Sequence, residues 1–428
     1  MARYETPEDI AGVLARFAPP RISRLLDPAV GGGRLVGPLL GQLSEQRAKV
    51  VCLDVDSAAL RGVVRLLRPS LGTNLRAETA DFLEWSSAAN RRKAFDCIVM
   101  NPPFLGKKKD ETQVSVPSDG EDQLRPASVE AAFTIRCLGL LRPGGVLLSV
   151  LPASLVSGKN ASWVRRHIMS CGAVRYVHEL PAKAFHGLEA RLYLFAFERG
   201  GTRRPTLLCN HDLKAPERLW VKASVLGQHD RWDYGFHEAR LNLETAAQSS
   251  PALGWRRVGE TVTMRRGGLS SPEGKRSGVH TCDFRGGIWH IDRAELQPRP
   301  DRYSLRTSDL LIKRVGRACS QSTGIVLRQT SVGATDCVLI LRPKRSGEEF
   351  ATLFGLRAVL GASSGASLVE QGTGASYIAE DSLSGLQIPM NIKNVYPSLY
   401  DRYVACTEVG DGEGILKLEA ELRKRLGL

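Results

Sequence analysis

The chain has 428 residues, of which 43% are hydrophobic and 24% are charged. This composition excludes a disordered or collagen-like protein, and the length allows two or three domains with sizeable cores. The formal net charge is +14, which favours a polyanionic partner, although a solvated basic surface without any partner gives the same excess.

The first predicted element is an amphipathic helix that follows Thr6 and Pro7. We expect Thr6 to be the N-cap and Pro7 the first helical residue, because a hydroxyl accepts the free N–H groups of the first turn and proline fits there without loss. One apolar face would consist of Ile10, Val13, Leu14 and Phe17.

A short strand over 22–26 ends in Asp27-Pro28-Ala29-Val30-Gly31-Gly32-Gly33, and Leu35, Leu39 and Leu40 predict a helix after it. Strand, acid, glycine turn and helix form the first unit of nucleotide-binding α/β domains. Glycines let the backbone approach a ligand, and a helix N-terminus offers N–H donors. The phosphate-binding pattern G-x-x-x-x-G-K-[ST] is missing, and a glycine-rich turn is often only a tight loop.

Acidic residues also follow the next two predicted strands. Asp54 and Asp56 end the strand over 49–56, roughly 20 residues after the glycine turn, where such domains place an acid on a ribose hydroxyl. We assign Asp54 to that role and Asp56 to the N-cap of the next helix. A third strand over 75–77 precedes Asp81 and Phe82, which suit a hydrogen bond to an amino group and packing on a ring.

The apolar run 94–100 predicts a buried parallel strand, and Asn101-Pro102-Pro103-Phe104 follows it. The prolines end the strand and stiffen the turn. Ligands of open α/β sheets bind outside the carboxyl ends of strands. An amide oxygen, free carbonyls and an aromatic face there suit a planar base that carries an amino group. A proline-terminated strand with a buried Phe gives the same four residues without any function.

The polar segment 106–126 predicts a loop, in which Lys107 and Lys108 either contact phosphate or are simply solvated. A helix over 127–141 carries Phe133. A strand over 146–152, a helix over 161–170 and strands over 173–180 and 190–197 follow. Phe185, between the last two strands, is either a stacking face or part of the core. Residues 199–250 lack clear periodicity and are predicted to be a connecting region.

The second half predicts short strands over 256–266, 287–291, 309–315, 324–326 and 337–342, and a closing helix over 414–428. Residues 240–345 contain 19 Lys and Arg against 9 Asp and Glu, whereas residues 346–428 contain 7 against 11. The basic part is therefore the expected nucleic-acid-facing surface, with Lys313 and Arg314 as candidate contacts. We divide the chain into domains 1–235 and 236–428.

Residues 1–198 resemble the gamma-class N(6)-adenine-specific DNA methyltransferases of restriction–modification systems, because short motifs stand in that family's order. The resemblance implies a Rossmann-like α/β domain that binds S-adenosyl-L-methionine. It also implies which residues contact the cofactor. They are Thr6 of the N-terminal motif, Asp27, Pro28, Ala29, Gly31 and Gly33 of the acid-Pro-Ala-x-x-x-Gly turn, Asp54 at the ribose, Asp81 and Phe82 at the adenine, and Phe133 as a further wall of the adenine pocket.

The same resemblance makes Asn101-Pro102-Pro103-Phe104 the catalytic motif, with Phe in place of the commoner Tyr. Asn101, Pro102 and Phe104 would be catalytic, whereas Pro103, Lys107, Lys108 and Phe185 would contact the substrate, Phe185 by stacking on the extruded base. The amide and the Pro102 carbonyl would accept the two hydrogens of the adenine amino group. No metal and no acid–base pair is required.

The second half is similar to the target recognition domains of such enzymes and of type I specificity subunits. The segments on which this similarity rests are 308–316, 372–374 and 383–389. The resemblance implies a mixed α+β domain that contacts double-stranded DNA, and a separate restriction endonuclease as a possible partner. The alternatives are methylation of RNA adenine or of a protein glutamine amide, and a DNA-recognition module without catalysis.

The sequence also predicts the compartment. Nine cysteines contain no C-x-x-C pair, which indicates reduced thiols and neither a disulfide framework nor a zinc site. No signal peptide is recognised, and no apolar run reaches membrane-spanning length. We expect a soluble, cytoplasmic protein.

Overall fold

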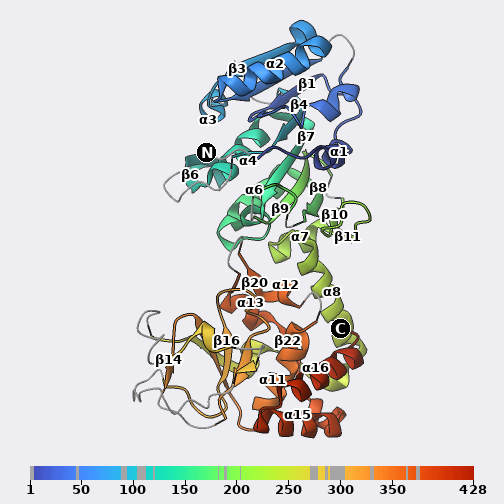
Figure 1. Cartoon of the computed structure of the whole chain (residues 1–428). Coiled ribbons are helices and arrows are strands. Elements are labelled where there is room, and N and C mark those ends of the chain that lie inside the picture. Colours follow the sequence, from blue (N-terminus) through green and yellow to red (C-terminus); the bar gives the residue numbers. More distant parts are fainter. Residues whose placement is uncertain are drawn as a thin grey trace. The chain divides into compact units, whose positions relative to one another are not determined.

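The computed structural model describes residues 4–44, 48–87, 94–103, 112–118, 121–181, 183–187, 190–202, 204–269, 278–284, 288–289, 304–327, 332–362, 365–372 and 376–428. The chain divides into two compact units, Met1–Tyr234 and Gly235–Leu428. Figure 1 labels their helices and strands. Each unit is described by itself.

The first unit contains a nine-stranded sheet in the order β11-β10-β8-β9-β7-β4-β1-β2-β3. From β7 to β3 all neighbouring strands are parallel, whereas β9 runs antiparallel to both β7 and β8. The strands are β1 (Arg24–Asp27), β2 (Lys49–Asp54), β3 (Leu75–Thr79), β4 (Phe95–Met100), β7 (Leu141–Pro152), β8 (Gly172–Glu179), β9 (Leu192–Arg199), β10 (Thr206–Cys209) and β11 (Arg218–Val221). This topology confirms the expected Rossmann-like α/β class.

The strand order reverses at β1, which pairs with β2 on one side and with β4 on the other. Ligands of open α/β sheets bind at this point, outside the carboxyl ends of the strands. Asp27 ends β1 and Asn101 directly follows β4. The topology therefore places the Asp27 carboxyl group and the Asn101 amide at one edge of the sheet.

Helices cover both faces of this sheet, because successive strand residues point to opposite sides. Leu26, Ile98 and Leu147 belong to the cluster that includes α4 and α6, while Leu25, Val99 and Leu148 belong to the cluster that includes α1 and α2. The helices are α1 (Glu8–Ala15), α2 (Ser57–Leu71), α3 (Phe82–Trp85), α4 (Val129–Leu140), α5 (Ala153–Val156), α6 (Ser162–Cys171) and α7 (Ala223–His229).

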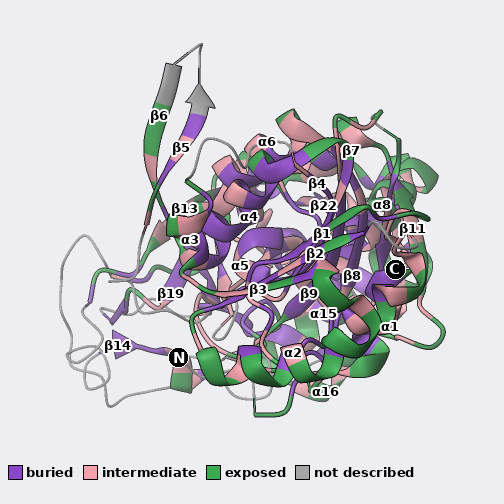
Figure 2. Cartoon of the chain, turned by 90° about the horizontal axis from the view of Figure 1, so that it is seen from above, coloured by how far each residue is buried: buried purple, intermediate pink, exposed green. Residues whose placement is uncertain are grey.

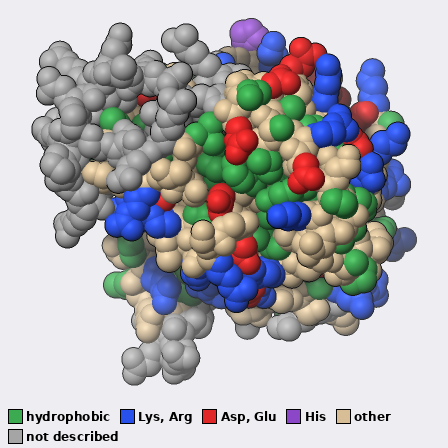
Figure 3. Space-filling view, turned by 90° about the horizontal axis from the view of Figure 1, so that it is seen from below, with side chains coloured by type: hydrophobic (Ala, Val, Ile, Leu, Met, Phe, Trp, Pro, Cys, Tyr) green, Lys and Arg blue, Asp and Glu red, His purple; other side chains and the backbone are tan. Residues whose placement is uncertain are grey.

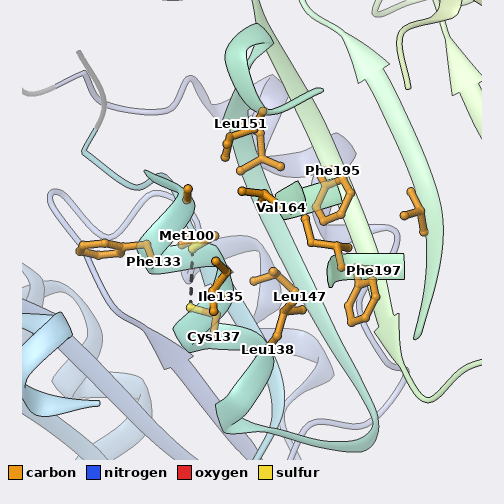
Figure 4. Close-up of a cluster of buried hydrophobic side chains, with 14 of the residues drawn as sticks. Met100, Phe133, Ile135, Cys137, Leu138, Leu147, Leu151, Val164, Phe195 and Phe197 are labelled. Carbon is orange, nitrogen blue, oxygen red and sulfur yellow. Dashed lines mark hydrogen bonds between the residues drawn. The ribbon is translucent and has the colours of Figure 1, made fainter. Parts of the chain in front are cut away.

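The packing of α4 fixes both Phe133 and the end of β4. Figure 4 shows side chains of α4 against Met100 of β4 and Leu147 of β7, with Cys137 Sγ 3.6 Å from the Met100 sulfur. Met100 is fully buried directly before Asn101. Because such interiors are close-packed, the position of Asn101 is set by the core beneath it.

The second unit is a mixed α+β structure around the five-stranded sheet β13-β19-β16-β17-β15. Its strands are β13 (Val262–Arg266), β19 (Val338–Pro343), β16 (Leu310–Lys313), β17 (Thr323–Ile325) and β15 (Ile288–Trp289). Three two-stranded pairs accompany it: β12 (Trp255–Arg257) with β22 (Gln387–Pro389), β14 (Gly278–Val279) with β18 (Gly333–Ala334), and β20 (Glu370–Gln371) with β21 (Tyr377–Ile378).

The helices of this unit are α8 (Tyr234–Ser249), α9 (Val258–Thr261), α11 (Glu349–Leu360), α12 (Ala366–Val369), α13 (Glu380–Gly385), α14 (Ile392–Val395), α15 (Pro397–Val409) and α16 (Gly412–Leu426). The predicted closing helix is confirmed as α16. Across the described part of both units, no helix has the length and apolar character that crossing a membrane demands.

Several expected elements differ from the structure in the first unit. The residues after the glycine turn form a 3-10 helix, η1 (Gly37–Gln42), in place of an α-helix. The segment 106–126 is not only a loop, since its described part contains the antiparallel hairpin of β5 (Thr112–Ser118) and β6 (Glu121–Ala127), which stands away from the sheet in Figure 2. The missed signal was the alternation of buried Val114 and Val116 with polar neighbours.

Two further expectations were wrong. Residues 199–250 are not a simple connection but contain β10, β11, α7 and α8, because short strands and a helix with few apolar residues leave weak periodicity. The predicted strand over 256–266 is divided into β12, α9 and β13, and Gly259 lies inside the interrupting helical turn.

A buried ion pair connects two helices and the sheet of the second unit. Arg357 of α11 and Glu419 of α16 pair through two hydrogen bonds, and both side chains are almost fully buried. Arg357 also donates to Thr323 Oγ1 of β17 at 2.6 Å. The pair therefore connects two helices with the sheet.

Glu419→Ala leaves the Arg357 guanidinium buried without its carboxylate. We expect the free energy of unfolding to fall by roughly 3–5 kcal/mol, the usual cost of removing one partner of a buried pair. Glu413→Ala is the matched control on the same helix, because the Lys417–Glu413 pair is exposed and such pairs contribute about 1 kcal/mol or less. Urea unfolding of the full chain measures both. Equal losses of unfolding free energy in the two variants would contradict the structural role of the Arg357–Glu419 pair.

Candidate functional site

A cavity of about 1120 Å³ opens in the first unit at the carboxyl ends of β1, β2 and β4. Its volume is sufficient for a cofactor-sized ligand. The predicted site residues that line it come from the N-terminal segment, the glycine turn, the ends of β2 and β4, and helices α3 and α4: Thr6, Asp27, Pro28, Ala29, Gly31, Asp54, Asp81, Phe82, Asn101, Pro102, Pro103 and Phe133.

The glycine turn is fastened to β2 by backbone and carboxylate contacts. Gly31 has a φ of +50° and donates its N–H to Asp54 Oδ2 at 2.9 Å. A Cβ on Gly32 would lie 2.8 Å from Glu5 Oε1, so the turn and the N-terminal segment approach closely there. Gly33 does not line the cavity. Its φ of +77° nevertheless favours glycine.

Asp27 is a buried carboxyl group at the floor of the cavity. Its side chain is 1% exposed, and Asp27 Oδ1 accepts the Ala29 N–H at 3.1 Å. Burial raises the pKa of Asp27 to about 8, against the lowering effect of the Ala29 N–H, and the nearby Asp54 charge adds to the rise. Asp27 is therefore largely protonated at neutral pH.

The other acids of the site also have local structural contacts. The two oxygens of Asp54 accept N–H groups from Gly31 and Asp56, each at 2.9 Å. Asp56 caps α2 through the N–H of Ala58, as predicted. Asp81 caps α3 in the same way, with its Oδ1 2.7 Å from the N–H of Leu83. A loss of either cap would disturb the cavity wall as well as any ligand contact.

Phe82 of α3 and Phe133 of α4 form an aromatic corner of the cavity. Their ring centroids are 4.8 Å apart with an interplanar angle of 46°. Both side chains are less than a tenth exposed. Because each ring is fixed by the core, the corner offers a preformed apolar surface to a flat ligand.

The side chain of Asn101 is held by the N-terminal segment. Asn101 Nδ2 donates to the Tyr4 carbonyl oxygen at 3.0 Å and to Thr6 Oγ1 at 3.2 Å. A carbonyl only accepts, so this contact assigns nitrogen to that side of the amide and oxygen to the other. Asn101 Oδ1 is buried and has no hydrogen-bond partner in the described structure. A buried polar atom of this kind needs an explanation, and a ligand donor is one.

The prediction that Thr6 is the N-cap of α1 was therefore wrong. Pro7 occupies the N-cap position of α1 and makes no side-chain cap, whereas the buried Thr6 hydroxyl accepts from Asn101. Sequence reasoning also missed the Tyr4 carbonyl, because a backbone acceptor leaves no signature in the sequence. Arg34, Val55 and Thr112 likewise line the cavity without having been predicted.

Phe185 does not line the cavity. Phe185 is 3% exposed and packs in the core cluster with α1 and β8, so its ring is not accessible in this conformation. The stacking role of Phe185 stays a prediction. Phe104, Lys107, Lys108 and Thr373–Gly374 lie outside the described residues.

Lys313 and Arg314 belong to the second unit, at the end of β16. Lys313 Nζ donates to the Arg317 carbonyl at 3.1 Å, and Arg314 Nε donates to the Asp336 carbonyl at 2.8 Å. Figure 3 shows one face of the molecule, on which basic and acidic side chains are mixed around apolar ones. The net positive charge thus does not form a face of one sign in that view.

The raised pKa of Asp27 predicts a pH-dependent stability. Between about pH 4 and pH 8 the folded state holds a proton that the unfolded state has released, so the free energy of unfolding falls as pH rises through this range. Asp27→Asn keeps the shape and has no such titration. We expect the variant to gain stability relative to wild type between about pH 5.5 and pH 8.5, measured by urea unfolding. A difference that does not change with pH would refute the protonated state.

Comparisons with known proteins bear on the first unit. Residues 1–219 match the protein family described as N-6 DNA Methylase. A stretch of 188 residues, 43% of this chain, is 23% identical to "Defense against restriction protein B" of Escherichia phage P1 and covers 8% of that protein. The chain therefore spans only a small part of this relative.

Two solved structures are similar at low identity. A methyltransferase subunit of a type I restriction-modification system from Streptococcus thermophilus is 20% identical with a TM-score of 0.40, over 48% of this chain and 47% of that chain. The type IIG restriction endonuclease BpuSI is 14% identical with a TM-score of 0.49, over 97% of this chain and 60% of that chain.

S-adenosyl-L-methionine is the methyl donor that this fold implies, and the polar and aromatic groups that line the cavity fit it. The molecule carries a cationic sulfur, an amino group, ribose hydroxyls and an adenine. The cavity offers the carboxyl groups of Asp27, Asp54 and Asp81 beside the aromatic corner of Phe82 and Phe133. The family match covers slightly more than half of the chain, and the chain belongs to the N-6 DNA methylase family.

Proposed function

We propose that this protein is a site-specific DNA methyltransferase that transfers a methyl group to the exocyclic amino group of an adenine in duplex DNA. The observation that carries the proposal is the buried Asn101 Oδ1, which has no hydrogen-bond partner in the described part of the chain and lies beside a cavity that fits the methyl donor. From the resemblance of the motifs we place the activity in a restriction–modification system, in which a separate restriction endonuclease would be the partner.

The chemistry follows from the state of the adenine nitrogen. Its lone pair is delocalised into the ring, so the amino group is a poor nucleophile. Asn101 Oδ1 and the Pro102 carbonyl oxygen would accept its two hydrogens, which favours a tetrahedral nitrogen with a localised lone pair. Fixed acceptors of this kind act by positioning and by electrostatic preorganisation. When bound, the cofactor supplies a methyl group on a cationic sulfur.

The remaining cavity residues would hold the cofactor. The carboxyl groups of Asp27, Asp54 and Asp81 would accept hydrogen bonds from its polar groups, while Phe82 and Phe133 would pack on its adenine. Asp27 would ionise as the positively charged ligand binds, since a nearby cation favours the charged form of an acid.

The target adenine would have to leave the DNA stack to reach Asn101, because its amino group is not accessible to such a cavity inside a duplex. Stacking on an aromatic side chain offers about 1–3 kcal/mol per base toward this cost. Phe104 is our candidate for that contact by its place in the motif.

We propose that the second unit reads the DNA. Its support is the basic composition of residues 240–345 and the loop after β16. There Gly316 (φ +113°) and Ala318 (φ +51°) flank the exposed Arg317, and the Gly316 N–H is bonded to the Ser376 carbonyl at 2.8 Å. A fixed loop that presents a cation suits a contact with a phosphate.

Asn101→Ala removes the amide acceptor and is expected to abolish adenine methylation while cofactor binding changes little. The measurement is single-molecule sequencing of DNA from a methylation-free host, combined with calorimetric titration of the cofactor. Asn394→Ala, an exposed amide of the second unit, is the control and should methylate normally. Equal methylation in both variants would contradict the mechanism. Unmodified DNA with wild type would favour an RNA or protein substrate, or a recognition module without catalysis.

Arg317→Ala is expected to weaken DNA binding and to reduce the slope of log affinity against log salt by about 1, as for the loss of one phosphate contact. Arg402→Ala is the control, since Arg402 is 63% exposed in the acidic last part of the chain. Binding of duplex DNA at several salt concentrations measures both variants. An unchanged slope in Arg317→Ala would remove this residue from the DNA contacts.

A further inference from the structure

We propose that Thr6 is a positioning residue for the catalytic amide and not a cofactor contact. Its hydroxyl, together with the Tyr4 carbonyl, would fix the Asn101 side chain so that the oxygen alone faces the substrate amino group. This inference rests on the proposed function, because it concerns the same amide. It differs from the sequence-based expectation, which assigned Thr6 to the cofactor.

The first support is the completeness of the hydrogen bonding. An amide nitrogen carries two N–H groups, and the two acceptors of Asn101 Nδ2 are Tyr4 O at 3.0 Å and Thr6 Oγ1 at 3.2 Å. Both contacts join residues more than ninety positions apart in the sequence. The amide nitrogen therefore has no N–H group left for another partner.

The second support is the use of the Thr6 hydroxyl. Thr6 is 4% exposed, and the cap position of α1 belongs to Pro7. Among the described residues, Thr6 Oγ1 has no other hydrogen bond than the one from Asn101. A threonine at this place thus serves the amide and not the helix.

The third support is the chemistry of an inverted amide. A rotation of the Asn101 amide by a half turn would bring two N–H donors to the amino group of the substrate, which is itself a donor. No hydrogen bond could then form, and the lone pair would stay in the ring. The Tyr4 carbonyl oxygen opposes this rotation, because it can only accept and would repel the amide oxygen. Thr6 Oγ1 adds to the observed orientation by accepting the second N–H of the amide.

The segment that holds the amide is itself braced. Arg34 Nη1 pairs with Glu8 Oε1 at 2.5 Å, and Arg34 Nε lies 3.7 Å from Glu5 Oε2. Arg34 follows the glycine turn, and Glu5 approaches Gly32 of that turn. The orientation of Asn101 is thus connected with the turn that forms the cofactor cavity.

The test compares Thr6→Val, which keeps the shape and lacks the hydroxyl, with Thr6→Ser, which restores it. We expect Thr6→Val to lower kcat by about 3–10-fold, the effect of one neutral hydrogen bond, with the dissociation constant of the cofactor within twofold of wild type. Thr6→Ser should recover most of the rate. Thr134→Val is the matched control, because the buried Thr134 hydroxyl, within the described structure, donates to the Glu130 carbonyl of its own helix and to no other group.

A readout without turnover is the exchange of the Asn101 side-chain N–H protons, observed by NMR in protein labelled with 15N at asparagine. We expect slow exchange in wild type and in Thr134→Val, and faster exchange in Thr6→Val. A weakened cofactor affinity with unchanged kcat and unchanged exchange would overturn the proposal and make Thr6 a cofactor contact. An inactive wild type with protected Asn101 protons would instead reject the proposed function and retain the positioning of the amide.

Discussion

The two N–H groups of the Asn101 side chain are both donated to the N-terminal segment, to Tyr4 O and Thr6 Oγ1. These contacts decide which atom of the amide is left over, and the atom left over is an acceptor. They also require that residues 4–6 cross the carboxyl end of β4. The cavity wall, the course of residues 4–6 and the orientation of the amide are therefore consequences of one hydrogen-bond arrangement.

The sheet supplies the rigidity that this arrangement needs. Every residue of β4 is buried, and the strand is tied to β1 at its beginning, where Asp96 accepts the N–H groups of Ser23 and Arg24 at 2.6 and 2.8 Å. At its other end Pro102 and Pro103 restrict the backbone directly after Asn101. A side chain with few free rotations then needs only two hydrogen bonds to be held in one orientation.

The sequence predicted the position of the cavity in the first unit, while the roles of its residues stay predictions. Asp27 at the end of β1, the glycine turn and the turn after β4 were recognised because each combines special backbone needs with polar side chains. Thr6 was misplaced, since N-capping and a long-range hydrogen bond use the same hydroxyl, and only the fold decides between them. The strands β10 and β11 were missed because they have four residues each, and the hairpin of β5 and β6 was missed because its alternating pattern lies within a polar segment.

Asp27 and Asn101 share a property that connects their roles. Without a ligand, the Asp27 carboxyl is buried at a cost that raises its pKa to about 8, and Asn101 Oδ1 is buried with no donor among the described residues. A cationic ligand relieves the first condition and an amino group relieves the second. We therefore expect a cation beside the glycine turn and a hydrogen-bond donor beside β4 to bind better than a hydrophobic or anionic ligand of equal size, because only they remove these two costs.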